Sequence, residues 1–372
     1  MIQVFSNSLG KDELAALAPV FESKWIGLGK ASKLFEEELG KKLGSKRVLL
    51  TDSCTSALFL AVRILGIGPG DEVIIPSVNF IGTANAVISS GAKPVFVDVD
   101  TRYFNILPEE IERARTKKTK AVLLLHYGGH PCDMEKIYTA AKGLYIIEDN
   151  ANSPFSKYKE KSCGTLGNVG CFSFDAMKIL CTGNGGALCL GSDELYDKAV
   201  GLRYFGLKKK KQSGIDSFKE NQKRWWEIEL DSASGRFVTC DIISAIGRIQ
   251  LKKVDEFIKR RKEIWNIYQK ELNGLPWLIT PPEPLANTES SYYFYWLKVP
   301  GGKRDAFARY LVENGVYCTF RYFPLHLIRY YGSKETLKNS ELINEEAIDI
   351  PLHQNLTGRD VEIIISAVKK FI

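Results

Sequence analysis

Short apolar runs alternate with longer segments of helical spacing through the first two thirds of this chain. The apolar runs lie at residues 48–50, 72–75, 92–100, 121–125, 144–147 and 170–174, and each has the length of a buried strand. Helical spacing occurs at residues 11–22, 31–43 and 57–62. Strands that alternate with helices predict an α/β fold with a mainly parallel sheet and right-handed crossovers.

The pattern changes after a basic helix predicted at residues 252–272. Glycine and proline at 274–276 and 281–284 mark a boundary, and shorter elements follow. Residues 292–298 alternate like a strand, residues 304–314 form a helix that ends at Gly315, and Thr357 caps a last helix. We expect a large cofactor-binding α/β domain over residues 1–255 and a smaller C-terminal domain of mixed helices and strands (α+β) over residues 256–372.

Composition places the chain among ordinary globular proteins. It has 372 residues, of which 45% are hydrophobic and 26% are charged, and its net charge is +7. The basic residues are spread out, and the one dense run, at residues 208–211, sits in a polar stretch typical of a solvated loop. A nucleic-acid partner is therefore not expected, whereas a mild positive balance suits anionic ligands such as nucleotide diphosphates.

The spacing of the cysteines and the pattern of the amino terminus indicate in which cellular compartment the protein is expected. The eight cysteines show no C-x-x-C pair, and several lie in apolar runs, so we expect reduced thiols. The first residues lack the pattern of a signal peptide, and the sequence has no apolar run of about 18 residues. The expectation is a cytoplasmic protein with no membrane partner.

Candidate chemistry gathers between residues 149 and 186. Asp149 follows the apolar run at 144–147, and the carboxyl ends of strands are where open α/β sheets bind ligands. Ser173 and Lys178 follow the next run, before a flexible turn at residues 182–186. An aspartate can keep a heteroaromatic nitrogen protonated, a serine can bind phosphate, and a lysine can form a Schiff base. Pyridoxal 5'-phosphate (PLP) needs these three groups.

A second candidate anion site follows the first apolar run. Ser53, Cys54 and Thr55 stand where the strand at 48–50 passes into a helix, so free backbone N–H groups and the positive end of the helix dipole point the same way. A plain helix cap is the alternative interpretation.

Four residues, His126, His130, Cys132 and Asp133, invite a metal site. Two glycines and Pro131 interrupt this segment, so a regular helix cannot bring both histidines to one face. We expect no metal.

Residues 148–152 and 164–174, with Lys178 and residues 183–186, resemble the core motif of the DegT/DnrJ/EryC1/StrS family of sugar aminotransferases. Further similarity extends the resemblance from about residue 5 to the carboxyl terminus. It implies the PLP-transferase architecture called fold type I, in which helices sandwich a mainly parallel seven-stranded sheet. It also implies a homodimer whose subunits share their active sites.

The resemblance assigns roles to several residues. Lys178 would hold PLP as a Schiff base and move the proton, Asp149 would keep the pyridine nitrogen protonated, and Phe80 would stack on the ring, although core packing is its other interpretation. The phosphate would be held by Ser173, Ser53, Cys54 and Thr55, with Cys54 where glycine is usual. Asn152 stands where a glutamine commonly meets the ring's 3-oxygen.

Substrate contacts are implied at four further positions. Trp25 and Gly29 belong to a segment near the family's sugar-nucleotide pocket, where Trp25 would stack on a base or sugar or else anchor its loop. His326 falls in a loop that borders the pocket. Arg236 stands where asparagine is common, and Val238 where arginine is common. We expect the Arg236 guanidinium to contact the cofactor phosphate or the nucleotide diphosphate across a dimer interface.

The implied activity moves an amino group from an amino acid, L-glutamate, to a nucleotide-linked keto sugar. Residues 225–227 and Arg236 favour a 4-keto-6-deoxy sugar, in the biosynthesis of deoxyamino sugars for an O-antigen or cell-surface glycan. The nucleotide stays open among dTDP, UDP and GDP. Two alternatives remain: a PLP-dependent sugar 3-dehydratase of the same family, which would carry histidine in place of Lys178, and a non-catalytic sensor with this fold.

Overall fold

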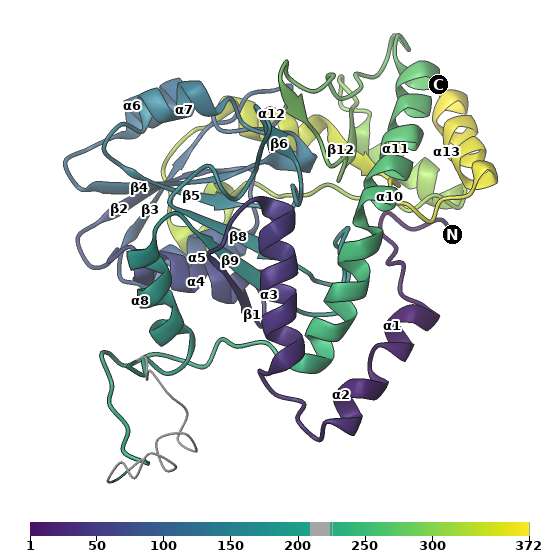
Figure 1. Ribbon diagram of the computed structural model, residues 1–372. Helices are drawn as coiled ribbons and strands as arrows, with labels where there is room; N and C mark the ends of the chain where they lie inside the picture. The colour runs from purple at the N-terminus through teal and green to yellow at the C-terminus, as the bar shows by residue number, and fades with distance from the viewer. Residues whose placement is uncertain (209–223, 225, 372) are drawn as a thin grey trace.

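A seven-stranded sheet forms the centre of the computed structural model, which describes residues 1–208, 224 and 226–371 (Figure 1). The strands, in spatial order, are β1 (Val48–Thr51), β9 (Gly186–Leu190), β8 (Val169–Ser173), β5 (Tyr145–Asp149), β4 (Thr119–Leu125), β2 (Glu72–Pro76) and β3 (Lys93–Val97). Strand β9 pairs antiparallel with β1 and β8, and the other neighbours pair parallel. The prediction of a mainly parallel seven-stranded sheet is confirmed.

Helices cover both faces of this sheet, because the strand pleat divides its apolar residues between two cores. In β4, Ala121 and Leu123 face the core beneath α4 (Cys54–Ile64), α5 (Ile81–Ser89) and α8 (Asp193–Arg203). Val122 and Leu124 face the core beneath α6 (Pro108–Ala114) and α7 (Met134–Ala140). On that same side, α3 (Lys30–Leu43) and α10 (Asp241–Leu272) cover β1, β8 and β9. The predicted sandwich of helices is therefore present.

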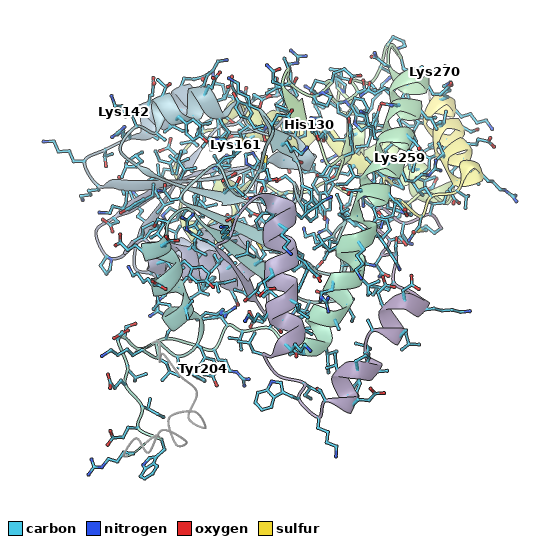
Figure 2. The ribbon with its side chains drawn as sticks, viewed as in Figure 1. His130, Lys142, Lys161, Tyr204, Lys259 and Lys270 are labelled. Atoms are coloured by element: carbon cyan, nitrogen blue, oxygen red, sulfur yellow. The ribbon has the colours of Figure 1, made fainter. Side chains whose placement is uncertain are left out.

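The carboxyl-terminal elements build a further core. Strands β11 (Tyr295–Lys298) and β12 (Ala347–Ile350) pair antiparallel, and α11 (Arg304–Glu313), α13 (Gly358–Lys370) and the second half of α10 pack around them. Helix α10 runs unbroken through residues 255 and 256, so the division of the chain there stays a prediction. Figure 2 shows exposed Lys259 and Lys270 on this helix and Lys142 far from them, in line with the dispersed basic residues of the sequence.

Smaller elements complete the described chain. They are β6 (Lys157–Tyr158), β7 (Lys161–Ser162), β10 (Thr288–Glu289), α12 (Lys338–Glu346) and the 3₁₀ turns at Tyr127–Gly129, Leu325–Leu327 and Arg329–Tyr331. The first predicted helix is two, α1 (Lys11–Ala15) and α2 (Ala18–Glu22). Pro19 explains the break, because proline has no N–H to continue the helical ladder. Among the described residues no helix is long and apolar enough to span a bilayer.

The carboxylate of Asp241 ties the two long helices together at their amino termini. Asp241 is the first residue of α10, and its oxygens accept hydrogen bonds from the backbone N–H groups of Gly29, Ala31 and Ser32 at 2.9, 3.1 and 2.9 Å. They also accept from the Ser32 hydroxyl at 2.7 Å. One buried carboxylate therefore satisfies the free N–H groups at the start of α3 and complements its dipole.

Replacing Asp241 tests this arrangement. Asp241→Ala leaves one buried and two partly buried N–H groups without an acceptor, and we expect it to lower the free energy of unfolding by about 2–4 kcal/mol. The measurement is urea denaturation at fixed protein concentration. Asp255→Ala is the matched control, because Asp255 lies on the same helix in an exposed ion pair with Lys42 and should cost less than about 1 kcal/mol. Equal losses in the two variants would contradict this account of Asp241.

Candidate active site

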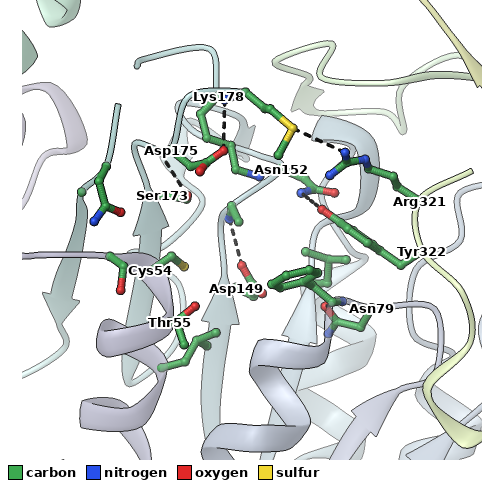
Figure 3. Close-up of a pocket in the computed structure, with 18 residues that line it drawn as sticks. Cys54, Thr55, Asn79, Asp149, Asn152, Ser173, Asp175, Lys178, Arg321 and Tyr322 are labelled. Carbon is green, nitrogen blue, oxygen red and sulfur yellow. Dashed lines mark hydrogen bonds between the residues drawn. The ribbon is translucent and has the colours of Figure 1, made fainter. Parts of the chain in front are cut away.

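A cavity of about 210 Å³ opens at the carboxyl ends of β5 and β8, beside the start of α4 (Figure 3). Eight residues that the sequence singled out line it, namely Ser53, Cys54, Thr55, Phe80, Asp149, Asn152, Ser173 and Lys178. Asn79, Asp175, Met177, Asn184, Arg321 and Tyr322 lie among the other lining residues. The cavity is therefore where an open α/β sheet is expected to bind a ligand.

Asp149 closes one end of this cavity as a nearly buried carboxylate at the last position of β5. Its Oδ1 accepts the N–H of Ala151 at 2.9 Å. Burial raises the pKa of Asp149, while that hydrogen bond and the positive charge of Lys178 lower it. A carboxylate in this position gains from a cationic group placed in the cavity.

The preceding residue, Glu148, points to the other side of the strand and holds the neighbouring loop and His126 in place. Its carboxylate accepts three backbone N–H groups from residues 164–167 at 2.5–2.7 Å. It also meets His126 Nε2 at 3.0 Å. His126 Nδ1 accepts the N–H of Cys132, so Nε2 carries the hydrogen and donates to Glu148. His126 is thereby committed to structure, and no group of three metal-binding side chains occurs in the described part of the chain.

Lys178 follows β8 and brings its amine into the cavity from a nearly buried position. Its Nζ donates to the hydroxyl of Tyr293 at 3.2 Å. Burial raises the pKa of Tyr293, so the hydroxyl stays protonated as pH rises. Arg261 is fully buried behind this tyrosine and donates to its carbonyl oxygen at 3.3 Å. Tyr293 lies in a strand-like stretch without a distinctive motif, so its role could not be predicted from the sequence.

Ser53, Cys54 and Thr55 at the start of α4, here called the α4 cradle, line the other side of the cavity together with Ser173, where the sequence predicts a phosphate site. Ser53 caps α4 by accepting the N–H of Ser56 at 3.1 Å. The next two residues, Cys54 and Thr55, line the cavity, so the amino terminus of the helix lies beside it. A Cβ on Gly186 would lie only 2.4 Å from the Ser53 carbonyl carbon, so glycine permits β9 to pass this close. Burial raises the pKa of Cys54 well above its ordinary value. The thiol that replaces the usual glycine is therefore neutral and does not repel phosphate.

Two amides in the cavity retain unused hydrogen-bonding capacity. Asn152 donates from Nδ2 to the Tyr322 hydroxyl at 3.2 Å, but its Oδ1 is buried without a partner in the described chain. Asn79 has an unpartnered Nδ2 in the same way. Phe80 is 48% exposed, with its ring 5.6 Å from that of Tyr322, so the alternative of core packing for Phe80 is wrong.

Four predicted substrate residues do not line this cavity. Trp25 is exposed and donates to the Leu28 carbonyl at 3.1 Å, and Gly29 is the N-cap residue that precedes α3. Arg236 is exposed, with Cζ 5.9 Å from the Tyr204 ring centroid. His326 is buried between the Ser77 hydroxyl, 2.6 Å from Nδ1, and Glu341, 3.2 Å from Nε2. Their substrate roles stay predictions, and Trp225 and the lysines at 209–211 lie outside the described residues.

The cavity has the donors and acceptors that PLP requires. Asp149 can pair with a cation such as a protonated ring nitrogen, and Lys178 has the amine that a Schiff base needs. The α4 cradle and Ser173 can bind a phosphate. The unpartnered atoms of Asn152 and Asn79 suit a polar ring substituent. The fold and this set of side chains define a PLP-dependent enzyme of fold type I.

Comparison with known proteins specifies the family. The model of the DegT/DnrJ/EryC1/StrS aminotransferase family matches residues 7–369. A dTDP-4-dehydro-2,3,6-trideoxy-D-glucose 4-aminotransferase of Saccharopolyspora spinosa is 41% identical over 374 residues, covering 100% of this chain and 96% of its own. The chain belongs to this family and is a PLP-dependent aminotransferase.

Solved structures agree with this assignment. The aminotransferase TlmJ of Streptoalloteichus hindustanus is 42% identical, with a TM-score of 0.93 over 99% of this chain and 98% of that chain. Helicobacter pylori PseC, an aminotransferase involved in the biosynthesis of pseudoaminic acid, is 28% identical, with a TM-score of 0.91 over 99% and 98%. The likeness thus extends over nearly the whole length of each chain.

The buried carboxylate gives a pH-dependent prediction. Because burial raises the pKa of Asp149, its ionisation destabilises the cofactor-free fold as pH rises above the unfolded value of about 4. Asp149→Asn should therefore raise the Tm of the cofactor-free protein more at pH 8 than at pH 5. The same variant should lose at least about tenfold in cofactor affinity, or about 1.4 kcal/mol. A Tm difference independent of pH, or unchanged cofactor affinity, would contradict this view.

Tyr293 is expected to position the lysine. Tyr293→Phe removes the hydroxyl that accepts from Lys178, and we expect about a tenfold slower amino transfer with little change in KM. Tyr295→Phe is the matched control, since its buried hydroxyl has no partner among the described residues. Steady-state kinetics of both variants make the comparison, and equal rates in the two would rule out this role.

Proposed function

We propose that this aminotransferase acts on a nucleotide-linked keto sugar in deoxyamino-sugar biosynthesis, with L-glutamate as donor and a 4-keto-6-deoxy sugar as acceptor. The observation that carries the proposal is the 41% identity, over the whole chain, to an enzyme named as a dTDP-4-dehydro-2,3,6-trideoxy-D-glucose 4-aminotransferase. A GDP-perosamine synthase of Escherichia coli O157:H7, 30% identical over 100% of this chain and 98% of its own, supports the nucleotide-sugar class.

Each side chain of the cavity would have a separate role in the amino transfer. Bound PLP supplies an aldehyde for the amine and a ring that accepts electrons from the reacting carbon. Asp149 would keep the ring nitrogen protonated and so favour that electron flow. Lys178 would hold and move the proton at Nζ, and the Tyr293 hydroxyl would keep Nζ in position. The α4 cradle would bind the phosphate.

Lys178 also separates the proposal from its rivals. A dehydratase of this family would carry histidine at this position, and a sensor has no need for a buried amine in hydrogen-bonding contact with a positioned hydroxyl. Neither alternative is favoured by any contact described above.

The proposal includes a homodimer in which Arg236 reaches the neighbouring subunit's site. Exposed apolar side chains near the start of α3 and after α8 support it, among them Phe21, Trp25, Ile26 and Phe205. A cytoplasmic location is also proposed, and it is supported by the free thiol state of all eight cysteines. Analytical ultracentrifugation tests the dimer.

The decisive experiment follows the visible absorption of the PLP-loaded protein. L-Glutamate should shift the absorption to that of the amino form of the cofactor, and a panel of 4-keto and 3-keto nucleotide sugars should then restore it, with mass spectrometry of the product. Lys178→Ala should abolish both changes, because it removes the proton carrier. Lys142→Ala, an exposed lysine outside the cavity, is the control. A product that has lost water would indicate the dehydratase, and no response to any amino donor would indicate the sensor.

A further inference from the structure

Arg321 places a positive charge in the cavity, and no acidic side chain of the described residues forms an ion pair with it. It lines the cavity, and within the described part of the chain no carboxylate oxygen lies within 4.0 Å of its guanidinium. Its Nη2 instead donates to Met177 Sδ at 3.4 Å, and its Cζ lies 4.9 Å from the centroid of the Phe5 ring. By contrast, Arg203 and Arg248 pair with Glu36 and Glu38. A guanidinium without an anion beside a ligand cavity is available for one.

The backbone of Arg321 is held firmly although its side-chain charge is not paired. Asp349 Oδ2 accepts the N–H of Arg321 at 3.1 Å, and the Tyr127 hydroxyl donates to the Arg321 carbonyl. Both partners are buried, and burial raises the pKa of Asp349 well above its ordinary value. Asp349 therefore fixes the main chain of Arg321 without neutralising the guanidinium. Such preorganisation lowers the entropic cost of binding an anion.

Arg321 lies on the opposite side of the cavity from the α4 cradle. Figure 3 shows Arg321 and Tyr322 on one side of the cavity and Cys54 and Ser173 on the other, with Asp149 between them. The partner of the guanidinium, Met177, is adjacent in sequence to Lys178, so the charge lies near the amine that reacts. The cavity thus has one anion site for the cofactor and a second beside the reacting lysine.

We infer that Arg321 binds the α-carboxylate of the amino-acid donor, an inference that rests on the proposed function. In an α-amino acid the amine and this carboxylate share one carbon, so the group that binds the carboxylate must lie close to the reacting lysine. The diphosphate of a sugar nucleotide is separated from a 4-keto carbon by the sugar ring, so its binding group belongs farther away. The planar fork of arginine matches a carboxylate with two parallel hydrogen bonds.

The two half-reactions allow this role to be measured separately. In stopped-flow measurements on PLP-loaded enzyme, Arg321→Gln should lower kcat/KM for L-glutamate by about 100-fold, because it removes a charge-assisted bidentate contact. Arg321→Lys, which keeps the charge but not the fork, should lose about tenfold. The reaction of amino-loaded enzyme with the keto-sugar nucleotide should be unchanged in both variants. Arg329→Gln removes an exposed charge eight positions along the chain and should alter neither half-reaction.

A binding measurement gives a readout independent of turnover. 2-Hydroxyglutarate has the α-carboxylate but no amine, and calorimetry should show about 100-fold weaker binding to Arg321→Gln than to the wild type. 4-Aminobutyrate, which lacks the α-carboxylate, should be a poor donor for the wild type, and its rate should change little in the variant. Thermal unfolding and the cofactor content of each variant separate a local effect from a folding defect.

Several outcomes would overturn the assignment. Unchanged L-glutamate kinetics and unchanged 2-hydroxyglutarate binding in Arg321→Gln would do so, as would equal losses in both half-reactions. Selective loss with the keto-sugar nucleotide would assign the guanidinium to the diphosphate instead. If the wild type accepts no amino donor, the proposed function fails by itself, while 2-hydroxyglutarate binding still decides whether Arg321 is a carboxylate site.

Discussion

Two consecutive carboxylates at the end of β5 point in opposite directions, and the rest of the site depends on that alternation. Glu148 gathers three backbone N–H groups and His126, so the loop at residues 164–167 is held against the sheet. Asp149, one residue later, is turned toward the cavity with one hydrogen bond from Ala151. The pleat of a single strand therefore separates a structural carboxylate from a functional one. Exchanging their roles would require shifting the strand by one residue.

The sheet and the cofactor half of the site could be predicted because both are encoded locally. Buried parallel strands are continuous apolar runs, and the ligand residues follow these runs directly along the chain, as Asp149 and Ser173 do. The cap at Ser53 is likewise visible as a hydroxyl between a strand and a helix. The break at Pro19 was missed because the apolar spacing continues through it.

The remaining wall of the cavity could not be predicted in this way. Tyr293 and Arg321 come from the last third of the chain, and tertiary packing alone brings them to Lys178 and Met177. Tyr293 stands in no distinctive motif, and Arg321 only adjoins the loop of His326 that the resemblance places beside the pocket. His326 shows the opposite case, since a histidine in a family motif is used to join a loop to Ser77 and Glu341. Long-range contacts of this kind are not encoded by periodicity.

Helix α10 has a mechanical consequence for how reactants enter. Its 32 residues run without interruption from the clamp at Asp241, against α3, into the carboxyl-terminal core that supports Tyr293 through Arg261. A rigid-body rotation of the carboxyl-terminal elements toward the cavity would require α10 to bend, and bending would break backbone hydrogen bonds of the helix. The two cores are therefore expected to keep their relative positions while the donor and the acceptor exchange beside the half-exposed ring of Phe80.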